Sequence, residues 1–124
     1  MNYDLSTMNH LNTGKTGEQM AADYLNQHGY SLLHKNWRHG HWEVDIIASK
    51  NEVLHFIEVK TRRTQKFGYP EETVNKKKIK NLMGAAEEYL YQHPEWKRIQ
   101  FDVLSITMLK GEEVEYFFIE DVFL

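Results

Sequence analysis

The chain has 124 residues and a mass of 14.8 kDa, a length typical of one domain with one hydrophobic core. Apolar residues make up 41% and charged residues 27% of it, which excludes collagen, coiled-coil and disordered chains. The absence of cysteine excludes a disulfide scaffold and cysteine-bound zinc, and favours a cytoplasmic location. No apolar run reaches the roughly 18 residues of a membrane helix, and residues 1–12 contain no basic residue, so we expect neither a membrane span nor a signal peptide.

Two segments have the apolar periodicity of helices. In residues 13–28 the apolar positions recur at spacings of three and four, as they do on one face of a helix. Gly29 follows as a typical helix stop. The second segment spans residues 75–92, with Asn75 as its N-cap.

Segments rich in β-branched and aromatic residues predict strands. These strands are residues 30–37, 42–49, 53–61, 98–108 and 113–119. The first three follow one another through short turns and predict an antiparallel meander. The element order α-β-β-β-α-β-β predicts a two-layer or three-layer α/β or α+β domain over residues 13–124, preceded by a flexible N-terminal extension at residues 1–12.

Two motifs resemble a nucleotide-binding loop and a metal site, but the residues around them do not fit either. Thr13–Thr16 is similar to the end of a phosphate-binding P-loop, but Asn9 stands where the pattern needs glycine and no buried strand precedes it. The small residues Gly14 and Gly17 more simply indicate a tight start or close packing of the first helix. His39 and His41 have the spacing of metal ligands, but the glycine between them indicates a turn with two exposed histidines. We interpret the isolated histidines as surface or helix-end residues: His28, His34, His55 and His93.

The net charge of −3 conceals a basic segment. The stretch from Lys60 to Lys80 has eight basic and two acidic residues, a net +6, which leaves −9 for the remainder of the chain. A local positive potential of this kind binds phosphates even on an acidic protein, although a solvated loop and helix face is the simpler interpretation of the charge alone. Three lysines in the first turn of the second helix interact unfavourably with its dipole. A bound polyanion would reduce this local cost in stability.

Ionisable residues converge on the second and third predicted strands. Side-chain alternation places Glu58 and Lys60 on one face of the third strand, and we expect Asp45, one hairpin earlier, beside Glu58. Both strands are otherwise strongly apolar, so these groups cost stability unless they are paired or bind a metal. Two carboxylates can bind Mg²⁺, and a lysine can position or deprotonate an attacking water. This set of groups is typical of metal-assisted phosphodiester hydrolysis. Glu18, at the edge of the apolar stripe of the first helix, is a candidate fourth member.

The pattern Glu-x-Lys is unspecific by itself. A second copy, Glu95–Lys97, follows Pro94 and has no apolar strand and no upstream acid. The residues alone leave two interpretations open: a catalytic or metal-binding role, and a buried ion pair in which Lys60 neutralises Glu58 and Asp45.

From residue 14 onward, short segments occur in the order and spacing of a known family. These are Gly17-Glu18, Ala21, Tyr24-Leu25, Gly29-Tyr30, Asn36 to Arg38, Glu43 to Ile47, Phe56 to Arg62, Gly68, Lys78, Arg98 and Phe101 to Val103. The chain thereby resembles the PD-(D/E)xK nuclease superfamily, which has the restriction-endonuclease-like fold, and more narrowly the small bacterial YraN-type uncharacterised proteins. The resemblance implies a central mixed β-sheet flanked by helices. It also implies that Asp45, Glu58 and Lys60 are catalytic, with Glu18 as the helix acid of resolvase-like members.

We therefore expect an endonuclease that depends on Mg²⁺ (or Mn²⁺) and hydrolyses phosphodiester bonds of nucleic acid, with DNA the favoured substrate. Asp45 and Glu58 are expected to hold the metal, Lys60 to manage the attacking water, and Glu18 to assist. The residues expected to hold phosphates are Arg62, Arg63, Lys66, Lys76, Lys77 and Lys80. Because base-reading candidates are few, we expect recognition of branches, ends or flaps rather than of sequence. A homodimer would supply two active sites for two strands.

Two other classes of function also fit the sequence. A non-catalytic nucleic-acid-binding module that retains the nuclease fold would bind in a salt-dependent way that Mg²⁺ does not affect. A small interaction protein, with an acidic C-terminal segment contacting a basic partner, would show no affinity for nucleic acid. The acidic residues of that segment are Glu112, Glu113, Glu115, Glu120 and Asp121.

Overall fold

The computed structural model describes residues 13–63, 76–109 and 111–122 of the chain. The predicted extension at residues 1–12 and the predicted phosphate ligand Lys66 lie outside the described residues. No helix within these ranges has both the length and the hydropathy needed to cross a membrane.

The observed element order is the predicted one, α-β-β-β-α-β-β. The elements are α2 (Thr13–Gln27), β1 (Ser31–His39), β2 (Trp42–Lys50), β3 (Val53–Arg62), α3 (Lys76–Gln92), β4 (Ile99–Thr107) and β5 (Glu115–Ile119). Helix α2 ends where expected, because Gly29 adopts a φ of 88°, a conformation that glycine accepts without steric cost.

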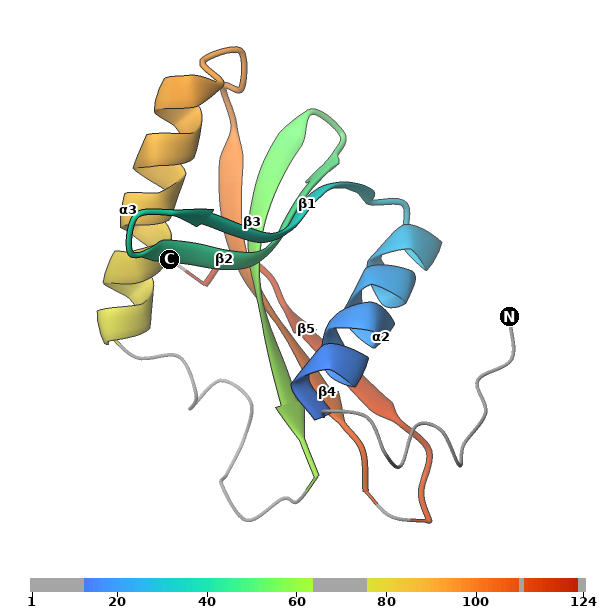
Figure 1. Cartoon of the computed structure of the whole chain (residues 1–124). Coiled ribbons are helices and arrows are strands. Elements are labelled where there is room, and N and C mark those ends of the chain that lie inside the picture. Colours follow the sequence, from blue (N-terminus) through green and yellow to red (C-terminus); the bar gives the residue numbers. More distant parts are fainter. Residues whose placement is uncertain (1–12, 64–75, 110, 123–124) are drawn as a thin grey trace.

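The strands form one mixed sheet of order β1-β2-β3-β4-β5. β1, β2 and β3 pair antiparallel, as the predicted meander requires. β3 and β4 are parallel, so the chain between them must cross over the sheet, and α3 lies on this crossover (Figure 1). β4 and β5 again pair antiparallel.

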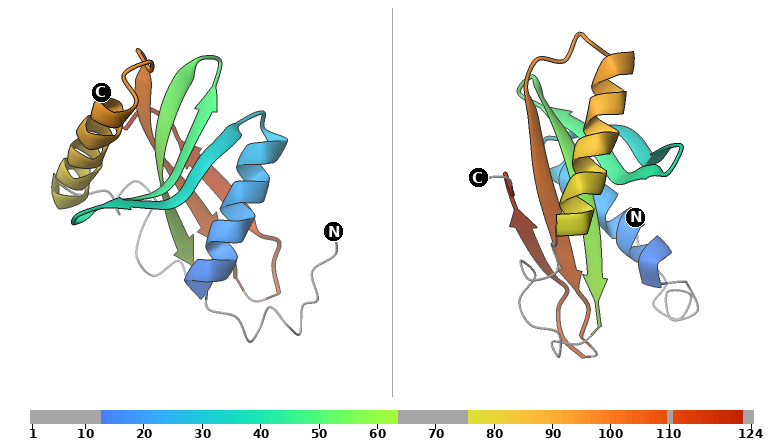
Figure 2. Two further views of the ribbon diagram at one scale, coloured as in Figure 1. Left: turned by 45° about the horizontal axis from the view of Figure 1, so that its top comes forward. Right: turned by 90° about the vertical axis from the view of Figure 1, so that its left-hand side faces the viewer.

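The two helices cover opposite faces of this sheet, as Figure 2 also shows. On one face α2 packs Met20, Ala21 and Leu25 against strand residues such as Ile57 and Leu104. On the other face α3 packs its own apolar stripe against β2 and β3. The buried residues of that stripe are Leu82, Ala85, Ala86 and Tyr89. A mixed sheet between two helices is consistent with the restriction-endonuclease-like fold that the resemblance implies.

Glycine permits a close approach of each helix to the sheet. A Cβ atom at Gly17 of α2 would collide with the Cγ2 atom of Thr61 on β3. A Cβ atom at Gly84 of α3 would collide with the indole ring of Trp42 at the start of β2. The prediction that Gly17 serves close packing is therefore confirmed.

The prediction for His55 is wrong. His55 is not a surface residue but 5% exposed, and its Nδ1 atom lies 2.6 Å from Oδ2 of the fully buried Asp102 on β4. The Oδ1 atom of Asp102 accepts hydrogen bonds from Gln100 Nε2 at 2.8 Å and from the Asp121 amide at 2.9 Å. The parallel pairing of β3 with β4 brings these residues together across 47 positions of sequence, a distance over which local pattern carries no signal.

The Gly17 contact predicts that the effect of Gly17→Ala on the free energy of unfolding depends on the residue at position 61. Gly17→Ala should lower the free energy of unfolding by about 1–3 kcal/mol, because overpacking outweighs the gain of about 1 kcal/mol from helix propensity. In a Thr61→Ser background, which lacks the colliding Cγ2 atom, the same change should be neutral or stabilising. Urea denaturation of the four proteins measures both effects. An equal loss of stability in the two backgrounds would show that Thr61 is not the obstacle.

Candidate active site

Strands β2 and β3 part at Asp45. Their antiparallel ladder ends with Ile46 opposite Ile57, whereas β2 remains paired with β1 to the end of the hairpin. The alternation of β2 also breaks here, because Val44 and Ile47 both pack in the α3 cluster while Ile46 packs in the α2 cluster. The far end of the β1-β2 hairpin leans toward α3 (Figure 1), where His39 Nε2 lies 3.1 Å from Glu88 Oε1.

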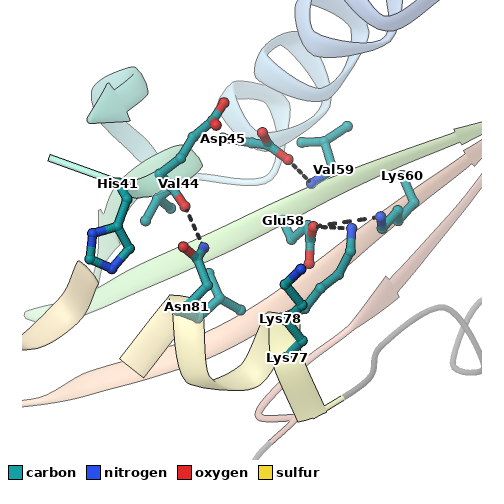
Figure 3. Close-up of a pocket in the computed structure, with 11 residues that line it drawn as sticks. His41, Val44, Asp45, Glu58, Val59, Lys60, Lys77, Lys78 and Asn81 are labelled. Atoms are coloured by element: carbon teal, nitrogen blue, oxygen red, sulfur yellow. Dashed lines mark hydrogen bonds and ion pairs between the residues drawn. The ribbon is translucent and has the colours of Figure 1, made fainter. Parts of the chain in front are cut away.

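The Asp45 side chain bridges the point where the strands separate. Its Oδ2 atom accepts a hydrogen bond of 2.8 Å from the Val59 amide of β3 (Figure 3). Burial raises the pKa of Asp45 from 3.8 to about 6; the Val59 hydrogen bond opposes this rise, and the negative charges of Glu58, Glu18 and Glu43 add to it. Among the described residues, burial and nearby acidic charges therefore outweigh the interactions that stabilise the ionised form of Asp45.

Glu58 is the residue of β3 directly before Val59, and its carboxylate has two lysine partners. Its Oε1 atom lies 2.7 Å from Lys78 Nζ and 3.5 Å from Lys60 Nζ (Figure 3). Its Oε2 atom is buried and has no hydrogen-bond partner among the described residues. A buried carboxylate oxygen without a partner is costly and is suited to a cation.

The two lysines differ in their electrostatic environment. Burial lowers the pKa of Lys60, and the neighbouring Lys78 lowers it further, while Glu58 partly offsets both effects. Burial also acts to lower the pKa of Lys78, but hydrogen bonds to Glu58 and Lys60 and the charges of Glu58 and Asp45 outweigh it, so that this pKa is raised. Lys78 is therefore the more firmly charged of the two, and Lys60 is the one closer to giving up its proton.

These residues line an open cleft of about 580 Å³ between β2, β3 and α3. The lining residues are His41, Glu43, Val44, Asp45, Glu58, Val59, Lys60, Lys77, Lys78, Asn81 and Leu82. The structure thus brings three of the four predicted catalytic residues, Asp45, Glu58 and Lys60, into one cleft.

Glu18 lies at the edge of the site rather than in it. The Gly17 contact presses α2 against β3, and the charge of Glu18 contributes to the raised pKa of Asp45. However, Glu18 does not line the cleft, and its Oε2 atom accepts a hydrogen bond of 3.1 Å from Asn36 Nδ2. In this arrangement Glu18 adds to the negative potential at Asp45.

The donor set fits a hard divalent cation that keeps most of its water. Within the described ranges, no three His, Asp or Glu side chains are grouped closely enough to hold a metal ion. Asp45 and Glu58 therefore supply at most two protein carboxylates, which is the number that Mg²⁺ commonly takes. The unpartnered Glu58 oxygen and the raised pKa of Asp45 both indicate a demand for positive charge at this point.

The elements that carry the lysines of the cleft also carry other basic residues. Lys76, Lys77 and Lys80 are exposed on the first turns of α3, Arg63 is exposed after β3, and Arg62 is half-buried. The predicted phosphate ligands that the structure describes therefore lie on β3 and α3, which carry the lysines of the cleft, or, for Arg63, directly after β3.

The sequence pattern alone did not assign Lys78 to the site. A signal for it was present, because Lys78, Leu82 and Ala85 are spaced by four and three residues and so share one face of a helix. That face is buried at Leu82 and Ala85, whereas Lys76, Lys77 and Lys80 are exposed. The helical period thus distinguishes Lys78, which faces the sheet, from the lysines that face solvent.

Comparison with known proteins gives relatives that all belong to one family. Residues 17–106 match the family described as "Uncharacterised protein family UPF0102". A UPF0102 protein of Cytophaga hutchinsonii is 44% identical over 107 residues, which cover 86% of this chain and 92% of the relative. One of Bacteroides thetaiotaomicron is 42% identical over 102 residues, covering 82% and 84%. One of Dictyoglomus thermophilum is 42% identical over 108 residues, covering 86% and 92%.

The raised pKa of Asp45 predicts a pH-dependent effect on stability in the metal-free protein. The folded protein holds this proton more tightly than the unfolded chain, so the contribution is complete below pH 3.8 and is lost as the pH rises through about 6. This pKa difference corresponds to about 3 kcal/mol. Asp45→Asn keeps the acceptor for Val59 and cannot ionise. Its advantage in the free energy of unfolding over the wild type should grow from near zero at pH 4 to about 3 kcal/mol at pH 8.

Urea denaturation in EDTA across this pH range measures the difference. The exposed Glu87 of α3 gives a control, since Glu87→Gln removes the same charge away from the cleft and should show no such trend. A constant difference between Asp45→Asn and wild type at all pH values would contradict the account of Asp45.

Proposed function

Because the chain belongs to the uncharacterised protein family UPF0102, the YraN-type family that its sequence resembles, we infer its function from the site itself and propose a metal-dependent nuclease. The proposed reaction is hydrolysis of phosphodiester bonds in nucleic acid with Mg²⁺ or Mn²⁺. One observation carries this proposal: Asp45, which is buried near other acidic side chains, and Glu58, whose buried Oε2 atom has no partner among the described residues, stand beside Lys60 in an open cleft where two strands part.

The residues of the chain divide the chemistry among them. Asp45 and Glu58 would hold the cation, which when bound polarises the phosphate and acidifies water. Lys60, in its neutral amine form, orients the attacking water and takes its proton to become the ammonium while the water oxygen bonds to phosphorus. The bond from phosphorus to the leaving sugar oxygen breaks, and that oxygen takes a proton from solvent. Lysine ammonium groups beside the cleft stabilise the added negative charge on the phosphoryl oxygens.

The charge distribution supports a polyanionic substrate. The first turn of α3 contains no acidic residue and presents Lys76 and Lys77 exposed at the positive end of the helix dipole. This clustering costs stability in the free protein and is relieved by phosphates. We favour DNA with branches, flaps or ends, because candidate phosphate ligands outnumber candidates for base reading. A homodimer would place one site on each strand of a duplex.

The proposal predicts cleavage that depends on the cleft. Purified protein should cut labelled branched, flapped, single-stranded or duplex DNA in Mg²⁺ or Mn²⁺ and not in EDTA. Asp45→Asn and Lys60→Met should each lower the rate by about 10²-fold or more, since removal of a metal ligand or of the proton acceptor acts on the transition state. Gel assays with the set of substrates measure the rates and identify the preferred substrate shape.

The chain contains a matched control for this experiment. Glu95 and Lys97 repeat the Glu-x-Lys pattern outside the cleft, so Glu95→Gln and Lys97→Met should cut like the wild type. Cleavage that survives in Asp45→Asn and Lys60→Met would point to a contaminating nuclease. Absence of cleavage by the wild type, with tight binding that Mg²⁺ does not change, would support the non-catalytic binding module instead.

The proposal also predicts which lysines contact phosphates. Changing the exposed lysines of α3 (Lys76, Lys77 and Lys80) together to Gln should weaken DNA binding for all sequences. The slope of log K against log salt should fall by about 0.9 for each phosphate that the variant no longer neutralises. Fluorescence anisotropy in EDTA at several salt concentrations measures it. The exposed Lys35, Lys97 and Arg98, changed together to Gln, remove the same charge outside α3. An equal effect from this control would contradict the proposed interface.

A further inference from the structure

Lys78 is a closer partner of Glu58 than Lys60 is. The Lys78 Nζ atom lies 2.7 Å from Glu58 Oε1, against 3.5 Å for Lys60 Nζ (Figure 3). Figure 3 shows the Lys78 side chain reaching from α3 to the carboxylate on β3. The charge of Glu58 is therefore neutralised mainly by a helix residue and not by the lysine of its own strand.

This ion pair and a divalent cation compete for the same carboxylate. Both lysines approach Oε1, while Oε2 is buried without a partner among the described residues. A hard cation on Glu58 would lie about 2 Å from a carboxylate oxygen. The Lys78 ammonium would then be within a few ångströms of a second, doubly positive charge, and in a partly buried site such charges repel strongly.

The backbone of α3 is held in place at this point. Asn81, one turn after Lys78, donates a hydrogen bond of 2.9 Å to the Glu43 carbonyl of β2. Gly84 allows α3 to contact the Trp42 ring one turn further on. A response at Lys78 is therefore confined to its side chain, whose flexible four-carbon stem can turn the ammonium toward the open side of the cleft.

We propose that Lys78 is an internal counter-cation of the site: it neutralises Glu58 while no metal is bound, competes with a divalent cation for that carboxylate, and once displaced presents its ammonium to a substrate phosphate. This inference rests on the proposed function, since it assumes that Asp45 and Glu58 bind a metal. It makes metal and nucleic acid bind cooperatively, because a phosphate gives the displaced ammonium a new partner.

Mn²⁺ binding in the absence of nucleic acid tests the first part. The electron paramagnetic resonance signal of free Mn²⁺ gives the Kd for wild type, Lys78→Met, Lys78→Arg and Lys77→Met. Lys78→Met should bind Mn²⁺ at least tenfold more tightly than the wild type, and Lys78→Arg should resemble the wild type. Lys77→Met removes the same charge on the same helix turn without a contact to Glu58, so its Kd should change less than threefold. Lys78→Gln serves as a second neutral variant, and thermal melts check that each protein is folded.

DNA binding tests the second part. With Ca²⁺ in place of EDTA, the wild type should bind a flapped DNA about tenfold more tightly, and Lys78→Met should lose most of that gain. Equal Mn²⁺ affinities of wild type and Lys78→Met, or equal changes of the Mn²⁺ Kd in Lys78→Met and Lys77→Met, would overturn this inference and leave the proposed function standing. Absence of Mn²⁺ binding at millimolar concentration in every protein would overturn both.

Discussion

The hydrogen bond from the Val59 amide to Asp45 compensates for the pairing that β2 and β3 lose beyond Ile46 and Ile57. A backbone amide left without a partner inside the sheet would be costly. The carboxylate that meets this need is itself removed from water, and burial with nearby acidic residues raises its pKa to about 6. The opening of the sheet and the buried Asp45 carboxylate of the cleft therefore have one origin.

The surroundings of the cleft hold this carboxylate in place. Gly17 lets α2 contact β3, and Gly84 lets α3 contact the first residue of β2. These contacts lie on opposite faces of the sheet, so that the diverging strands are supported from both sides. The lysines of the cleft leave one polar atom unsatisfied, since Glu58 Oε2 has no hydrogen-bond partner in the described part of the chain. A site that is destabilising without a ligand and rigidly supported is typical of function.

The sequence predicted most of this fold because its elements follow local periodicity. The alternation of β3 placed Glu58 and Lys60 together, and the short hairpin brought Asp45 near them. Two features depend on contacts that local pattern does not encode. The burial of His55 requires the parallel register of β3 with β4, which is set by the crossover. The position of Lys78 requires the docking of α3 on β2, although the spacing of Lys78 from Leu82 already indicates a sheet-facing residue.

The central claim is that Asp45 and Glu58 together bind a divalent cation, and diffraction from crystals of the protein soaked in Mn²⁺ tests it most directly. An anomalous difference map should show a peak about 2 Å from oxygen atoms of both carboxylates, with the Lys78 ammonium moved away from Glu58. A map with no peak between these residues, and with Lys78 still paired to Glu58 at saturating Mn²⁺, would contradict the account.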